Sequence, residues 1–92
     1  MGSYDAHKDA LLKRLRRIEG QVRGIQRMVE ESKYCVDILI QIAAVRAALD
    51  KVGLILLEDH TRGCVARAIK NSEGDADAAI SELTDVLRHF LR

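Results

Sequence analysis

Three residues of this sequence could bind one soft metal ion together: Cys35, His60 and Cys64. His60 and Cys64 are four positions apart, so on a helix they project from the same face with Cβ atoms about 6 Å apart, close enough to chelate one ion. Cys35 lies 25 positions before His60, which is about 37 Å along an unbroken helix. A single chain therefore cannot bring Cys35 to the other two residues.

A second copy of the chain could supply the missing cysteine. In two antiparallel copies of one helix the numbers of facing residues add to a constant, which is 95 for Cys35 with His60 and 99 for Cys35 with Cys64. The two-fold axis then falls between about residues 47 and 50, and this symmetry generates two equivalent sites, each shared by two subunits. The small residues near this axis are Ala43, Ala44, Ala47 and Ala48.

Two thiolates and one imidazole form a soft set of three ligands that suits Cu(I) better than Mg(II) or Ca(II). Structural zinc normally takes four protein ligands, and nickel would need further nitrogen ligands, for which His7 is a candidate. A buried cysteine in a helical protein is commonly only a small apolar residue, and we expect both His7 and His89 to be solvated. The spacing nevertheless predicts a Cu(I) site.

Three helices must position these residues. Apolar side chains recur at steps of four and three from residue 11 to residue 29, which predicts an amphipathic helix over about 5–31. Ser32 is a candidate N-cap for a long second helix over 34–70 that is apolar on nearly all sides. After a turn over 71–75, with Asp75 as a candidate cap, a third helix spans about 75–91. The expected fold class is all-α.

The length of 92 residues predicts one domain over 1–92, and 48% apolar with 32% charged residues excludes a disordered chain and a membrane protein. A central helix that is apolar all round needs more cover than two short helices provide, so we expect an oligomer. Two cysteines are too few for a disulfide framework, and the N-terminus has no apolar signal segment. The expected compartment is therefore a reducing cytoplasm.

The first predicted helix is strongly basic, since residues 8 to 27 carry seven basic side chains and two acidic ones. Such a face is often merely solvated. If several copies displayed it on one surface, it could follow the phosphates of duplex DNA. No helix-turn-helix or zinc-finger spacing indicates that a helix inserts to read the bases.

Residues 17–25, RIEGQVRGI, and residues 34–42, YCVDILIQI, resemble the two signatures of the CsoR/RcnR family of bacterial metal-responsive transcriptional repressors. The resemblance extends from about Lys8 to Leu87, and the predicted ligands are like those of its Cu(I)-sensing CsoR subgroup. It implies an antiparallel helical dimer, two of which form a homotetramer. It also implies that the metal-free protein binds double-stranded operator DNA and that Cu(I) releases it.

The resemblance further implies roles for residues around the ligands and on the basic helix. Tyr34 and Glu82 are expected to hydrogen-bond near His60. The expected DNA contacts are Lys13, Arg14, Arg17, Arg46 and Lys51.

Several alternatives remain open. Nickel-sensing relatives use a nitrogen-rich ligand set with a histidine near the N-terminus, which keeps a nickel-responsive repressor in view. Cys35 and Cys64 of different subunits could instead form the disulfide or polysulfide bridge of a thiol redox or persulfide sensor. A copper buffer without DNA affinity is a third alternative. An enzyme is not expected, because a Cys–His pair needs an orienting third group and a substrate pocket.

Overall fold

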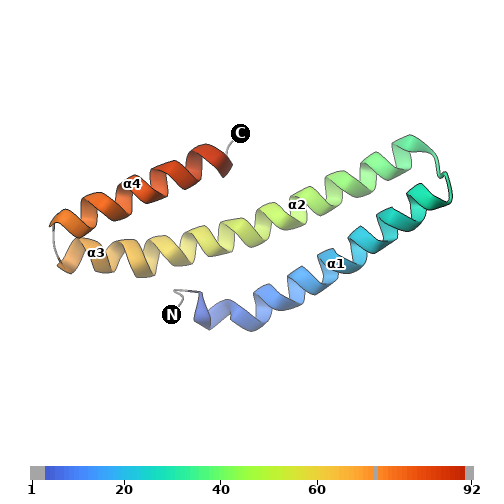
Figure 1. Ribbon diagram of the computed structural model, residues 1–92. Helices are drawn as coiled ribbons and strands as arrows, with labels where there is room; N and C mark the ends of the chain where they lie inside the picture. Colours follow the sequence, from blue (N-terminus) through green and yellow to red (C-terminus); the bar gives the residue numbers. More distant parts are fainter. Residues whose placement is uncertain (1–3, 72, 91–92) are drawn as a thin grey trace.

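The computed structural model describes residues 4–71 and 73–90, and for residues 64, 65 and 73 it describes the backbone alone. The described residues contain helices and no strand, which confirms the all-α fold class (Figure 1). A short 3-10 turn over Asp5–His7 leads into the first α-helix. The helical elements that follow are α1 (Lys8–Glu30), α2 (Cys35–His60), a π-helical segment (Thr61–Val65), α3 (Ala66–Asn71) and α4 (Glu73–Phe90).

The long central helix is present as a rod made of α2, the π-helical segment and α3, which follow one another without a break from residue 35 to residue 71. This path agrees with the predicted span of 34–70. At a rise of 1.5 Å per residue it is about 55 Å long, and the longest dimension of the chain is 56 Å. The rod therefore sets the length of the whole molecule.

Helix α1 packs antiparallel against α2. The buried core consists of Leu11 and Ile18 from α1 with Val45 and Val52 from α2. Each pair is seven positions apart, the spacing that keeps one stripe of a helix facing a partner helix. Ile25, Ala48 and Ile55 extend this core and are partly buried.

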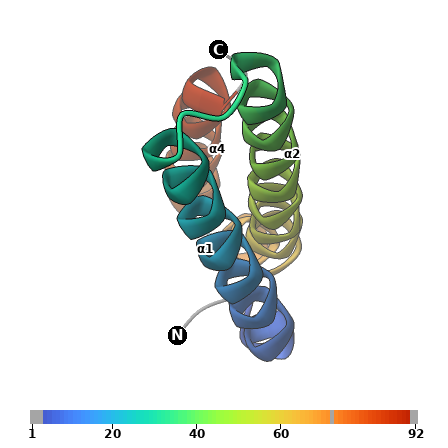
Figure 2. The same ribbon diagram turned by 90° about the vertical axis from the view of Figure 1, so that its right-hand side faces the viewer.

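The link between α1 and α2, at the near end of the rod in Figure 2, closes α1 by backbone hydrogen bonds. Lys33 N–H donates to the carbonyl of Met28, and Ser32 N–H donates to that of Val29, which is the Schellman arrangement. Ser32 occupies its left-handed position with φ of 54°. The prediction of Ser32 as an N-cap is therefore wrong: Tyr34 precedes α2 and makes no side-chain cap.

Helix α4 folds back beside the rod, and its last described residue, Phe90, packs its ring on Gly53 of α2. The predicted turn over 71–75 is too long, because α3 continues to Asn71 and α4 already begins at Glu73. Asp75 lies inside the first turn of α4, so its prediction as a cap is wrong. Leu91, in the predicted third helix, lies outside the described residues.

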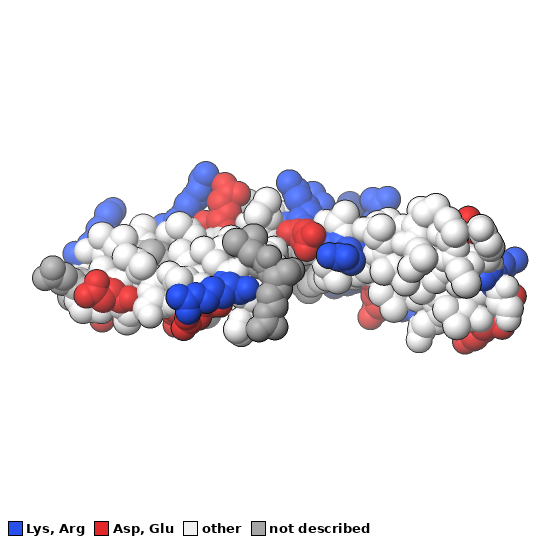
Figure 3. Space-filling model, turned by 90° about the horizontal axis from the view of Figure 1, so that it is seen from above, with Lys and Arg blue, Asp and Glu red and all other residues white. Residues whose placement is uncertain are grey.

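The chain leaves much apolar surface uncovered. Its accessible surface is 7257 Å², whereas a compact monomer of this mass exposes about 5,400 Å². Figure 3 shows mainly uncharged atoms over the right-hand end, where α4 does not cover α2. None of the helices in the described residues has the length and apolar character needed to cross a membrane.

Candidate metal centre

Cys35 and His60 are the first and last residues of α2. The 25 positions between them place the two residues about 37 Å apart along this helix. Cys35 is a free, exposed thiol, and His60 is half-buried. The two side chains cannot bind the same ion within one protomer.

The two residues nevertheless share one side of α2. Twenty-five steps of about 100° return a side chain to within about 20° of its starting direction. Apolar residues follow Cys35 along this side at intervals of seven, namely Ile42, Leu49 and Leu56, with exposed fractions of 39%, 46% and 37%. We call Cys35, Ile42, Leu49 and Leu56 the ligand-side stripe.

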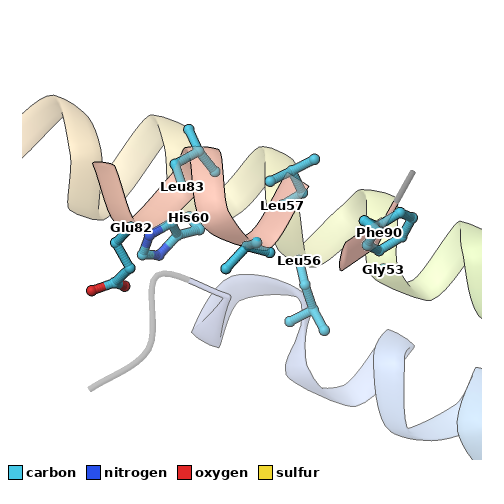
Figure 4. Close-up of a pocket in the computed structure, with 8 residues that line it drawn as sticks. Gly53, Leu56, Leu57, His60, Glu82, Leu83 and Phe90 are labelled. Carbon is cyan, nitrogen blue, oxygen red and sulfur yellow. The ribbon is translucent and has the colours of Figure 1, made fainter. Parts of the chain in front are cut away.

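His60 lines a cavity of about 320 Å³ between α2 and α4. Figure 4 shows Glu82 beside His60 at one end of this cavity and Phe90 over Gly53 at the other. The remaining lining residues are Leu56, Leu57, Leu83 and Val86. The histidine therefore sits at the edge of an apolar space with one carboxylate nearby.

Tyr34 directly precedes the first residue of α2. Glu82 belongs to α4 and lies at the other end of α2, beside His60. Glu82 is close to His60, although no hydrogen bond joins the two side chains in the described part of the chain. Tyr34 precedes Cys35 and is 69% exposed. Any contact between Tyr34 and His60 therefore requires a second protomer, as it does for Cys35.

Cys64 belongs to the π-helical segment Thr61–Val65, and its side chain lies outside the described residues. The backbone N–H of Ala66 donates to the carbonyl of Thr61, five positions earlier. Such wide turns within α-helices are uncommon and occur frequently at functional sites. Sequence reasoning expected a regular helix between His60 and Cys64; Gly63, the poorest helix former of this segment, was the available signal.

No group of three or more His, Cys, Asp and Glu side chains is gathered as a metal site among the residues whose side chains are described. One protomer thus presents a thiol at one end of α2 and an imidazole at the other. The types of these donors fit a soft ion such as Cu(I). Because of this separation, a site that used both residues would need a second chain.

His7 is paired with an acidic residue. Its Nδ1 lies 2.7 Å from Oδ2 of Asp59, with side chains 54% and 12% exposed, respectively. Asp59 directly precedes His60 in the chain. The expectation that His7 is simply solvated is thus incomplete, and sequence reasoning missed Asp59 because 52 positions separate the partners.

The basic residues expected to contact DNA are all exposed, but they do not share one side of the protomer. Arg14 and Arg17 line a cavity together with Ala48 of α2. Lys51 lies three positions after Ala48 and four before Ile55, so it faces the same side as these arginines. We call this the cationic side.

Arg46 and Lys13 lie elsewhere. Arg46 is four positions after Ile42 and three before Leu49, so it lies along the ligand-side stripe. This side of α2 is not the cationic side. Lys13 is exposed on α1 and does not line the cavity between Arg14 and Arg17.

Comparison with known proteins matches residues 7–89 to the metal-sensitive transcriptional repressor family. The chain is 61% identical over 85 residues to the copper-sensing transcriptional repressor CsoR of Bacillus subtilis (strain 168), covering 92% of this chain and 82% of that protein.

The similar solved structures include two metal-responsive regulators. The copper-sensing repressor CsoR with Cu(I) from Geobacillus thermodenitrificans NG80-2 superposes with a TM-score of 0.87 at 50% identity, covering 96% of this chain and 90% of the other. The nickel-responsive transcriptional regulator InrS superposes with a TM-score of 0.74 at 44% identity, covering 89% and 90%. The fold and most of the sequence are thus those of metal-responsive repressors.

Proposed function

This chain belongs to the metal-sensitive transcriptional repressor family, and from that premise we propose that it is a copper(I)-responsive repressor. The metal-free protein binds operator DNA, and occupation of its metal sites lowers this affinity. It is not an enzyme. Its place of action is the cytoplasm, where the operator is, and residues 1–92 form one helical domain.

The separation of Cys35 from His60 on one straight helix is the observation that carries the proposal. An antiparallel second copy places Cys35 of one protomer beside His60 and Cys64 of the other, and symmetry provides two such sites per dimer. Each site then has two thiolates and one imidazole. This donor set matches Cu(I), which the similar repressors of Bacillus subtilis and Geobacillus thermodenitrificans are named for sensing or binding.

The ligand-side stripe supports this pairing because it supplies an apolar contact surface between the two sites. Leu49 lies near the two-fold axis, and Ile42 of one copy approaches residues 53–57 of the other. Ala48 is not available for this contact, since it packs on the core between α1 and α2. Among the residues near the axis, the stripe therefore makes the contact, and Ala48 does not.

Residues around the ligands then have distinct tasks. Glu82 comes from the same chain as His60 and would orient its imidazole, whereas Tyr34 would arrive from the other chain with Cys35. Both would connect the metal site to the packing of helices against one another. Filling the site would thereby favour one arrangement of the protomers over another.

We propose that two dimers form a tetramer whose cationic sides bind duplex phosphates. Arg14, Arg17 and Lys51 supply this surface in each protomer. Lys13 and Arg46 lie away from the cationic side of their own protomer. They contact DNA only where the assembly brings them beside the cationic side of a neighbouring protomer. Because metal and DNA binding are coupled, operator DNA must weaken Cu(I) binding by the same factor by which Cu(I) weakens DNA binding.

A nickel-responsive repressor is the second candidate, favoured by the likeness to InrS and by the presence of His7 near the rod's His60 end. A thiol redox sensor is a third, because Cys35 is an exposed free thiol. It would respond to oxidant in the absence of metal.

Operator binding followed by fluorescence anisotropy under anaerobic conditions tests all three. Cu(I) should weaken operator binding by at least tenfold, while Ni(II) and Zn(II) at equal concentration have less effect. Equal binding with and without Cu(I) would rule out the copper proposal. A larger effect of Ni(II) would support the nickel candidate, and a response to oxidant alone would support the redox candidate.

A further inference from the structure

A small cavity on the cationic side contains a polar atom without a partner. The cavity, of about 210 Å³, is lined by Arg14, Arg17, Ile18, Gln21 and Ala48. Oε1 of Gln21 is buried from solvent and has no hydrogen-bond partner among the described residues. A buried carbonyl oxygen without a donor is costly, and native proteins keep few of them.

The two arginines that line the same cavity are candidate donors for this oxygen. Neither Arg14 nor Arg17 forms an ion pair with any residue in the described ranges. Each guanidinium carries five N–H donors and no acceptor. Arg17 lies four positions before Gln21, the helical spacing at which two side chains meet, so Arg17 is the better placed donor.

A phosphate group cannot satisfy Gln21 Oε1, because the oxygens of a phosphodiester only accept hydrogen bonds. A guanidinium can serve both groups at once, since its N–H donors point outward along different edges of a plane. One edge can donate to Oε1 inside the cavity while another edge faces a phosphate outside it. Ile18, a core residue, and Ala48, which packs against the core, line the same cavity as this amide.

We propose that Gln21 is a positioning residue for DNA binding: its Oε1 accepts an N–H of Arg17 and so directs the outer edge of that guanidinium to a phosphate of the duplex. This inference rests on the proposed function and adds to it a residue that holds no charge. The buried oxygen gains its missing donor in the DNA complex. Binding of the phosphate and satisfaction of Gln21 thus support each other.

The test compares Gln21→Met and Gln21→Asn with Gln26→Met, a control at an exposed glutamine of the same helix. Metal-free full-length proteins are titrated onto a labelled operator duplex and a mixed-sequence duplex of equal length at several salt concentrations. We expect Gln21→Met to weaken binding to both duplexes by about tenfold and to reduce the slope of log K against log salt by about 0.9, the value for one phosphate contact. Asn, which is too short to reach Arg17, should behave like Met.

Thermal unfolding separates positioning from a structural role. Gln21→Met removes the unsatisfied oxygen, so its melting temperature should equal or exceed that of the native chain. In an Arg17→Ala background Gln21→Met should cause no further loss of DNA affinity, since residues that act as a unit are not additive. Native affinity and salt slope in both Gln21 variants would overturn the inference, as would a full additional loss in the Arg17→Ala background or a loss of DNA affinity that merely follows a lowered melting temperature.

Titration of the native chain distinguishes failure of the proposed function from failure of the inference about Gln21. If it binds neither duplex, the proposed function fails and this inference fails with it. If it binds DNA and responds to Cu(I) while the Gln21 variants bind equally well, the inference alone is wrong.

Discussion

Nδ1 of His7 lies 2.7 Å from Oδ2 of Asp59, which ties the start of the basic helix to the residue before His60. The pair is partly exposed, and exposed pairs contribute at most about 1 kcal/mol. We expect His7→Gln to lower the free energy of unfolding by no more than this, and to leave Cu(I) stoichiometry unchanged. Urea unfolding and anaerobic Cu(I) titration measure the two quantities. A loss of bound copper would make His7 a ligand.

Cys35 and His60 should complement each other across the dimer. We expect Cys35→Ala and His60→Ala homodimers each to lose both complete sites. A purified heterodimer of the two variants combines both substitutions in one site and keeps the other site intact, so it should bind one Cu(I) ion where the native dimer binds two. Titration of differently tagged, co-purified heterodimers gives this count. A stable heterodimer that binds no copper contradicts a site shared between subunits.

The ligand-side stripe should be the dimer contact. Leu49→Glu places a charge in the middle of this contact, and a buried unpaired charge should weaken association by at least about 3 kcal/mol, or more than 100-fold in Kd. Sedimentation velocity over a range of protein concentrations measures the shift. The matched control is Ala44→Glu, which puts the same carboxylate four positions before Ala48, on the cationic side. If Ala44→Glu dissociates the dimer and Leu49→Glu does not, the dimer contact lies on the cationic side of α2 and the prediction is wrong.

Ser32 holds a left-handed backbone conformation, with φ of 54°. A residue with a Cβ pays about 1 kcal/mol or more for this conformation, and glycine does not. We expect Ser32→Gly to raise the free energy of unfolding by about 1 kcal/mol. Urea denaturation at a fixed protein concentration measures this change. A destabilised variant would mean that the Ser32 side chain itself supports the turn.

A Cβ atom on Gly53 would collide with the ring of Phe90. Gly53→Ala should therefore push α4 away from α2 and destabilise the fold by about 1 kcal/mol, a modest cost because the Phe90 side chain can move. The double variant Gly53→Ala/Phe90→Leu should recover part of this loss. Thermal unfolding of the two single variants and the double variant gives the coupling between the residues, and strict additivity would exclude the contact.

The long helix and the separation of its ligands could be predicted from sequence because periodicity accumulates over many residues. The steps of four and three predict the helix whose Leu11 and Ile18 are buried, whereas the second helix, apolar on nearly all sides, gave no signal for Val45 and Val52. The interpretation of Cys35 as a residue that needs a second chain follows from the same regularity. It depends only on the rise of a helix that has no breaker over its length.

The roles of single residues at the helix ends were predicted less well, because a cap residue and a turn residue can have the same side chain. Ser32 and Asp75 have the side chains of helix caps, yet one closes a Schellman turn and the other lies inside α4. The π-helical segment after His60 differs from an α-helix only in that its hydrogen bond spans five positions instead of four. The orphaned oxygen of Gln21 depends on side-chain packing between two helices, which no pattern in one helix specifies.

Only four side chains are buried among those that the structure describes, and this small core has a consequence for the chain in a growing cell. In the proposed dimer, a protomer with so small an interior would gain much of its stability from association, so the folded fraction would obey mass action and fall on dilution. Copy number would then set not only how often the promoter is occupied but also how long each polypeptide survives proteolysis. Newly synthesised chains without a partner would be the ones removed first.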